Sequence, residues 1–402
     1  TSTSGTFFVA STFTISGAPT FTHNSGTFTF DTSAVTLTPS TVTFYKVSFT
    51  SAVAKTIADS QTLTVANTLT LTDGSIAQTT IPAAGSIAAQ GDVTQASTFD
   101  GGTGKLVLSG SGTQTFTGGG STTVGELPDI EINSTGTIAL SSTIRTKNNW
   151  TYTAGTISEG TSAVVFSLGG SDTSATITGS MTFKNLTFNT TSNNVLTLTL
   201  ASGATLLVNG TLTLDATIGT TISLDGPGAI SAKGDVIASG DATDSGWGGS
   251  AVITINGTGA QALTGTTDSG VAFNRLPAVV VNKTAGLLSI TNIIQPRSGW
   301  TYTAGDISIG TSTFEFNALQ TITGSMSFYN MTMFKVGNTT STITIASGTI
   351  LTVTNTLTLN KTNVQGSEAL NGPGAISLTG NLDITGLAGT SSGWGGSAVI
   401  TI

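Results

Sequence analysis

The 402-residue chain has no cysteine and a single histidine. The sequence therefore excludes disulfides and thiolate metal sites, and one histidine cannot form a histidine-rich metal site. Charged residues make up 8% of the chain, against about 25% in an average protein. The net charge of −8 is spread thinly, with no basic cluster, so no nucleic-acid partner is predicted. No apolar run approaches the ~18 residues of a membrane-spanning helix.

Small hydroxyl side chains take the place of the missing charge. Thr and Ser together form roughly a third of the chain, and there are 51 glycines. The sequence starts with TSTSGTFFVA, without an initiator Met, a basic segment or an apolar segment typical of a signal peptide. We therefore expect a mature or excerpted form of a longer protein.

Long internal repeats organise the sequence, which argues for a repeat architecture. Four motifs occur twice at offsets between 145 and 150 residues: WTYTAG (150–155, 300–305), TITGSM (176–181, 321–326), GPGAIS (226–231, 372–377) and GWGGSAVITI (246–255, 393–402). The unit is therefore about 147 residues long. We predict a diverged partial repeat at 1–120, a full repeat at 121–265, and a second copy at 266–402 that ends short of its last strands, all in one continuous solenoid.

Short strands of alternating hydrophobicity fill each repeat. Runs such as VLTLTLA, TLLVNGTLTL and AVITI alternate apolar residues with Thr or Ser, which is the period of a half-buried strand. Gly, Asn, Asp and Ser separate the runs, and no stretch keeps a helical period. The chain is therefore predicted to be all-β. A parallel β-solenoid with coils of about 20–25 residues is favoured, and tandem β-sandwich domains are the alternative.

Large apolar residues recur at the same phase of the repeat, which favours the solenoid. Phe44, Phe183 and Phe328 correspond to one another, and so do Phe49, Phe188 and Met333. Stacked coils would place such residues in a continuous interior column, while the Thr of segments such as TLTLT would point outward.

Two segments resemble the β-strand-repeat proteins of bacterial cell surfaces. GTSAVVFSLGG...ATITGSMTFKNLTFNTT is followed by ATLLVNGTLTLD, and GTSTFEFNALQTITGSMSFYNMTM is followed by LTVTNTLTL. Proteins of this filamentous-adhesin-like class typically alternate TFNNLTI-like with LTVNGTLTL-like strands. The resemblance covers most of residues 20–402. It implies a right-handed parallel β-helix, an extracellular location, and a structural or adhesive role.

Catalytic residues are sparse. Polysaccharide hydrolysis requires two carboxylates about 5–10 Å apart, and the closest acid pairs are Asp241 with Asp244 and Asp129 with Glu131. Neither pair recurs in the second copy, so we interpret both as solvated turns. His23 is interpreted as a surface or turn residue, and the glycines of 101–104 and 118–121 as turn glycines. We predict no catalytic residue, no metal and no cofactor.

Two residue classes remain as candidates for glycan contacts. Exposed tryptophans could stack on sugar rings, although packing against a coil edge is the favoured interpretation; the candidates are Trp150, Trp247, Trp300 and Trp394. Asn-x-Ser/Thr sequons could carry N-linked glycans; these candidates are Asn185, Asn209, Asn282 and Asn330.

A stiff repeated chain without catalytic chemistry is expected to be structural. We predict a subunit or segment of an extracellular cell-surface fibre, sheath or surface layer that associates with its own kind, head to tail or laterally. An adhesin or carbohydrate-binding stalk, with surface glycans as partners, is the alternative. An ice-binding protein and a polysaccharide-degrading β-helix rank lower.

Overall fold

The structure is a computed structural model of residues 1–402. It describes the whole chain except residues 1–3, 17–20, 32–34, 40–41, 79–84, 171–172, 193, 217–220, 241–245, 268–274, 318–319, 335–340, 361–367 and 386–393. The chain divides into two compact units, Thr1–Asn189 and Thr190–Ile402.

Both units are parallel β-solenoids, as the sequence predicts. The described residues form strands and turns without an α-helix. Neighbouring strands run parallel in the first unit and in the second. Consecutive parallel strands require the chain to wind once around the core between them. A β-sandwich would instead require antiparallel pairs, so the alternative fold is wrong.

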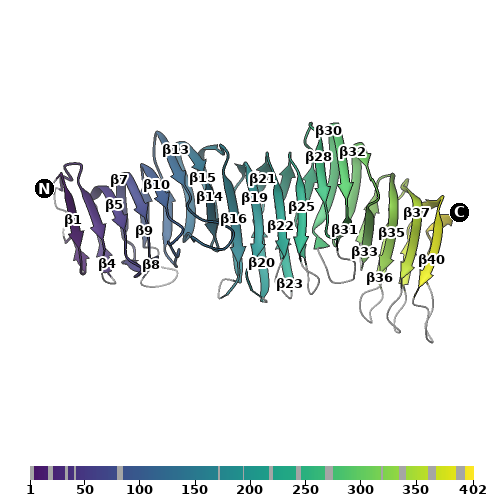
Figure 1. The fold of residues 1–402 in the computed structure, drawn as a ribbon, viewed down its shortest axis with the longest axis horizontal. Helices are drawn as coiled ribbons and strands as arrows, with labels where there is room; N and C mark the ends of the chain where they lie inside the picture. The colour runs from purple at the N-terminus through teal and green to yellow at the C-terminus, as the bar shows by residue number, and fades with distance from the viewer. Residues whose placement is uncertain are drawn as a thin grey trace. The chain divides into compact units, whose positions relative to one another are not determined.

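The described residues of the first unit form nineteen strands, the last of which ends at Thr190. They are β1(Thr6–Val9), β2(Phe13–Thr14), β3(Thr27–Phe30), β4(Val35–Thr38), β5(Thr43–Phe49), β6(Lys55–Ile57), β7(Thr62–Leu71), β8(Ile76–Gln78), β9(Ser86–Ala89), β10(Asp92–Gln95), β11(Lys105–Leu108), β12(Thr113–Thr117), β13(Asp129–Ser141), β14(Thr143–Thr146), β15(Trp150–Ser158), β16(Ala163–Leu168), β17(Ser174–Thr178), β18(Met181–Phe183) and β19(Asn185–Thr190). One face is formed by β1-β3-β5-β7-β10-β12-β13-β15-β17, with β9 and β11 also joining β7 to β13. The sets β2-β4-β6-β8 and β14-β16-β19 form other faces (Figure 1).

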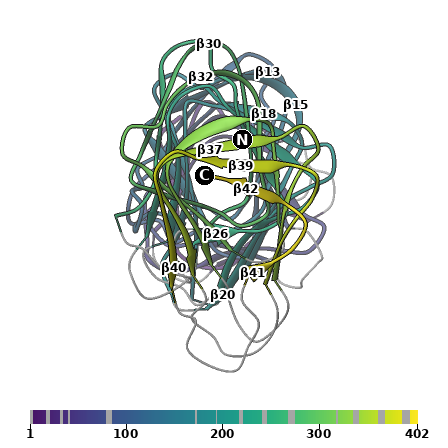
Figure 2. The ribbon, with the colours of Figure 1, turned by 90° about the vertical axis from the view of Figure 1, so that its right-hand side faces the viewer.

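The second unit contains the remaining strands. They are β20(Val195–Leu200), β21(Thr205–Val208), β22(Leu212–Ala216), β23(Thr221–Asp225), β24(Ala229–Ala232), β25(Val236–Gly240), β26(Trp247–Gly248), β27(Val252–Ile255), β28(Gln261–Thr264), β29(Arg275–Leu276), β30(Ala278–Thr291), β31(Ile293–Pro296), β32(Trp300–Ser308), β33(Thr313–Asn317), β34(Gln320–Thr323), β35(Met326–Phe334), β36(Ser341–Ile345), β37(Ile350–Asn360), β38(Glu368–Asn371), β39(Ala375–Leu378), β40(Asn381–Thr385), β41(Trp394–Gly395) and β42(Val399–Thr401). Its longest sheet paths are β22-β25-β28-β30-β32-β34-β36-β38-β41 and β29-β31-β33-β35-β37-β39-β42, and Figure 2 shows β37, β39 and β42 side by side.

Coil length varies because the turns vary. Phe28 lies opposite Val47, a coil of 19 residues, whereas Trp150 lies opposite Ile177, a coil of 27 residues. These coils bracket the predicted length of about 20–25 residues. Strand register is kept between most residues of the ladder, because a slip of one residue would turn every inward side chain outward, and it shifts only at local bulges such as those in β13 and β30.

The core consists of the apolar residues that alternate with Thr and Ser. In β20 the side chains of Leu196, Leu198 and Leu200 are buried, and the threonines between them are half-buried. Phe44, Phe183 and Phe328 are fully buried, as are the equivalents Phe49, Phe188 and Met333. The prediction that these positions point inward is therefore confirmed. Burial of this apolar area, at about 25 cal/mol per Å², is the main term that stabilises the coils.

Glycine in the repeated TITGSM motif is required by the backbone. Gly179 and Gly324 have φ angles of +87° and +86°. A Cβ added to them would lie 2.3 Å from the carbonyl oxygen of Tyr152 and 1.8 Å from that of Tyr302, respectively. Only glycine fits this turn, where the chain crosses closely over the preceding coil.

Candidate functional site

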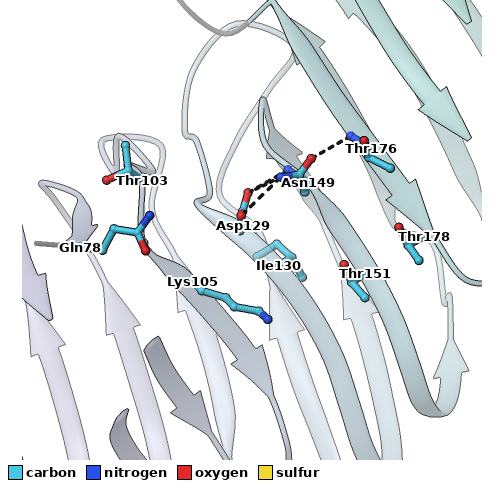
Figure 3. A pocket seen from close by; sticks show the side chains of 10 residues that line it. Gln78, Thr103, Lys105, Asp129, Ile130, Asn149, Thr151, Thr176 and Thr178 are labelled. Atoms are coloured by element: carbon cyan, nitrogen blue, oxygen red, sulfur yellow. Dashed lines mark hydrogen bonds between the residues drawn. The ribbon is translucent and has the colours of Figure 1, made fainter. Parts of the chain in front are cut away.

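A groove lies on the outer face of the first unit. It has a volume of about 530 Å³, which is within the usual range for small-molecule sites. It crosses β11, β13, β15 and β17 beside the end of β8 (Figure 3). Its lining residues are Gln78, Thr103, Gly104, Lys105, Asp129, Ile130, Asn149, Thr151, Thr176 and Thr178.

Alternation within the strands positions these side chains. Lys105 lies opposite Asp129 on adjacent strands. Thr151 lies opposite Thr178 one coil further on. Their neighbours Ile130 and Ile177 have 1% and 0% exposed surface, so the polar side chains must point outward. The groove is therefore a direct product of register in the ladder.

Asp129 and Asn149 form a rigid pair in the groove. The carboxylate Oδ1 of Asp129 accepts hydrogen bonds from the backbone N–H of Asn149 at 3.0 Å and from its Nδ2 at 3.2 Å; Oδ2 receives a third at 3.4 Å. The Oδ1 of Asn149 accepts a bond from the backbone N–H of Thr176 at 2.9 Å. These bonds join three successive coils and fix the orientation of the carboxylate (Figure 3).

Two of the charged residues at the groove form an ion pair, and the third, Asp129, has a shifted pKa. Lys105 forms an ion pair with Glu131. Burial raises the pKa of Asp129, and this effect is opposed by its hydrogen bonds to Asn149 and by the charge of Lys105. Desolvation thus exceeds the stabilising contacts at this carboxylate.

The acid pair Asp129 and Glu131 does not lie in a turn, and the sequence interpretation of this pair was wrong. Both residues belong to β13. Asp129 is half-buried, and Glu131, with 17% of its side chain exposed, accepts the ion pair from Lys105. Only Asp129 lines the groove, so the described lining offers one carboxylate. The second acid pair, Asp241 and Asp244, lies outside the described residues.

The second copy of the repeat presents a different surface at the equivalent strand positions. β13 pairs first with β11 and then with β15; β30 likewise pairs with β27 and then with β32. The registers place Val252, Ala278 and Gly299 where the first copy has Lys105, Asp129 and Asn149. The threonine rows recur, because Thr301 and Thr323 also lie opposite each other. The hydroxyls are thus common to both copies, and the charged and amide groups are specific to the first.

Lys283 is a buried amine that the sequence analysis did not identify. It is 1% exposed, and its Nζ donates to Gly257 O at 2.6 Å, Gly259 O at 3.0 Å and Gln261 Oε1 at 2.6 Å. Burial lowers the pKa of Lys283. The sequence could have indicated its burial, because Lys283 occupies an inward-facing position of the alternating strand VVVNKT.

The equivalent position in the first copy has a hydroxyl instead of an amine. Ser134 follows Asn133, and Lys283 follows Asn282, at the same bulge in β13 and β30. The Ser134 hydroxyl donates to Gly110 O at 2.6 Å. Both residues therefore satisfy carbonyl groups of the preceding coil, as buried acceptors require.

A buried arginine network lies beside the groove strands in the first unit. Arg145 is 3% exposed; its guanidinium lies 3.3 Å from Glu126 Oε1 and donates to Ser167 Oγ at 3.3 Å. Lys147 also pairs with Glu126. Burial lowers the pKa of Arg145, against the opposing effect of Glu126. This network joins neighbouring coils.

Three of the four candidate tryptophans lie in the core. Trp150, Trp247 and Trp300 are 0%, 1% and 0% exposed, which leaves no ring face for a sugar. The Nε1 of Trp247 donates to Asp215 O at 3.0 Å, and that of Trp300 contacts Met326 Sδ at 3.0 Å. Trp394 is half-buried. These three rings therefore pack in the core and cannot stack on a sugar, which agrees with the favoured interpretation of packing.

The four sequons divide into two groups. Asn209 and Asn282 are exposed. Asn185 and Asn330 are half-buried, and their Nδ2 groups donate to Ser162 O at 3.3 Å and Thr313 Oγ1 at 3.2 Å on preceding coils. N-linked glycans at the first pair remain a prediction, and the second pair would lose a coil-to-coil bond on modification.

The remaining sequence candidates occupy structural positions. His23 is half-buried, its ring stacks on Tyr45 with centroids 5.1 Å apart, and its Nδ1 accepts a bond from Ser25 N at 3.2 Å. Gly101 and Gly102 have φ angles of +73° and +100°, as expected of turn glycines. The described residues include no group of three or more His, Cys, Asp or Glu side chains suited to a metal ion.

Comparisons with known proteins return no relative. No protein family, curated protein or solved structure matches the chain. Within the part of the chain that the structure describes, no helix is long and apolar enough to cross a membrane. The case for function therefore depends on the residues themselves.

Proposed function

We propose that this chain is a structural protein of the extracellular surface, as a subunit or segment of a fibre, sheath or surface layer. The observation that carries the proposal is the parallel ladder formed by the described strands of each unit, with an apolar interior and outward-facing hydroxyls. Every coil is joined to the next by backbone hydrogen bonds and by buried columns, so the unit resists local bending. The resemblance of its motifs to bacterial cell-surface β-strand-repeat proteins supports the same role.

The chemistry of the outer face suits exposure outside a cell. With 8% charged residues, the surface depends little on ion pairs, which weaken with salt. Outward Thr side chains hold an extended backbone well because they are β-branched. Self-association, head to tail or laterally, is part of the proposal, because parallel strands leave edges that pair readily with further strands.

Electron microscopy of native material tests this role. Antibody raised against the chain should label the outside of the source cells, along filaments or within a continuous layer. Label confined to the cytoplasm, or discrete unassembled particles in native extracts, would refute the proposal.

An adhesin or carbohydrate-binding stalk is the second candidate, and the groove on the first unit favours it. Hydrolysis of polysaccharide is not favoured, because the described groove lining has one carboxylate and Glu131 is neutralised by Lys105. We expect no turnover of pectin-like polymers by the purified chain. Measured release of reducing ends would contradict this expectation.

A further inference from the structure

We propose that the groove across β11, β13, β15 and β17 binds a short, uncharged saccharide. This inference gives the second candidate function its site and rests on that candidate. It does not depend on the structural role. Four properties of the groove lead to it: a fixed carboxylate, unpaired hydroxyl and amide groups, the balance of charge, and the contrast with the second copy.

The carboxylate is held ready to accept hydroxyl groups. Two bonds from Asn149 engage Oδ1 of Asp129, and Oδ2 receives only the longer contact of 3.4 Å. Carboxylate oxygens accept several hydrogen bonds each, and bonds to an ionised acceptor are about twice as strong as neutral ones. Because the Asn149 bonds prevent rotation, little entropy is lost when a ligand binds.

The rest of the lining supplies neutral donors and acceptors. Among the described residues, no partner binds the hydroxyls of Thr151 and Thr178 or the side-chain amide of Gln78. Hydroxyls and amides both donate and accept. Each free hydroxyl group of a sugar also donates and accepts, so a sugar matches these lining groups better than a purely acidic or purely basic ligand would.

The charge balance selects against acidic saccharides. Lys105 and Glu131 cancel each other, which leaves the negative charge of Asp129 in the groove. An acidic ligand would bring a second negative charge toward a partly buried carboxylate, where repulsion is weakly screened. The described lining contains no aromatic ring, so binding depends on hydrogen bonds and is expected to be weak and selective.

The second copy shows that the fold does not require these groups. Val252, Ala278 and Gly299 occupy the equivalent positions and maintain the same strand pairing. A half-buried carboxylate costs free energy by desolvation, yet a neutral residue suffices for the architecture. Asp129 and Asn149 are therefore assigned to ligand binding, beyond the coil-to-coil hydrogen bonds that they make.

The test uses the full chain and three defined variants. Wild-type protein is titrated by calorimetry and by NMR with maltotriose, cellotriose and mannotriose, and with trigalacturonate as the acidic arm. We expect at least one neutral trisaccharide to bind, and Asp129→Ala to weaken it about tenfold or more. Thr178→Val should weaken binding by several fold while keeping the β-branched shape. Thr323→Val, at the equivalent position of the second copy, should leave binding unchanged.

Circular dichroism and amide hydrogen exchange establish that the variants fold. Tighter binding of trigalacturonate than of every neutral sugar would overturn the proposal, and so would binding that both groove variants leave intact. Absence of binding by every probe would overturn the site and the second candidate function together. None of these results would affect the structural role, which the microscopy tests separately.

Discussion

Replacement of Lys283 by methionine tests whether the buried amine stabilises the second unit. Methionine keeps most of the side-chain volume but removes three donated hydrogen bonds. Bonds to charged groups contribute about 1.5–3 kcal/mol each, whereas relief of ammonium desolvation offsets part of the loss. Gln261 Oε1 keeps its bond from Gly257 N at 2.8 Å, so two glycine carbonyls lose the Nζ donor. We expect the free energy of unfolding to fall by about 2–4 kcal/mol.

Urea denaturation and amide hydrogen exchange measure this change. Exchange should accelerate in β30, which carries Lys283, and in β28, whose Gln261 accepts a hydrogen bond from the amine. The control is Lys233→Met, because Lys233 is exposed and its Nζ donates to Asn256 O at 3.3 Å. Lys283→Ser introduces the residue found at the equivalent position 134, and its free energy of unfolding should fall less than that of the methionine variant. A methionine variant within about 0.5 kcal/mol of the control would refute the reasoning.

Three further predictions concern the turn glycine, the buried indole and the groove carboxylate. Gly324→Ala should lower the free energy of unfolding by about 1–3 kcal/mol. Gly259→Ala should have little effect on the urea midpoint, because a Cβ added there would meet no atom within 4 Å; equal effects of the two substitutions would contradict the steric argument. Trp300→Ala should cost about 3–5 kcal/mol in the same assay, and a cost below 1 kcal/mol would contradict its burial. The pKa of Asp129 is raised above 3.8 in the folded state, so the carboxyl group ionises at a lower pH in the unfolded chain than in the folded one. As pH rises from about 3.8 through the folded pKa, the free energy of unfolding of the wild type should therefore fall relative to that of Asp129→Asn. A rise over this pH range would contradict the direction of the pKa shift.

Strand period and repeat phase were enough to predict the fold. Alternation of Leu with Thr fixes which side chains point inward, and equivalent phase in two copies places Phe183 and Phe328 in the core. Local periodicity carries this information without knowledge of the turns. Packing of Trp150 and Trp300 was favoured on a different ground, because copies about 147 residues apart cannot form a continuous platform for a sugar chain.

The groove was not predictable by the same reasoning. Lys105, Asp129 and Asn149 are 24 and 20 residues apart in sequence, and only register across coils brings them together. Register depends on turn length, which the sequence pattern does not fix. The acids of β13 were therefore assigned to a turn, although the alternation of Asp129-Ile130-Glu131 was itself a strand signal.

The variable turns have a consequence for how such a chain can change in length. Trp150 lies opposite Ile177, and the equivalent Trp300 lies opposite Ile322, so the second copy closes this coil with five fewer residues and the same register. The difference falls between β16 and β17 in one copy and between β33 and β34 in the other. Changes in length between these strands therefore leave the register of the ladder intact, so repeats of this kind can diverge in length while their coils stay stacked.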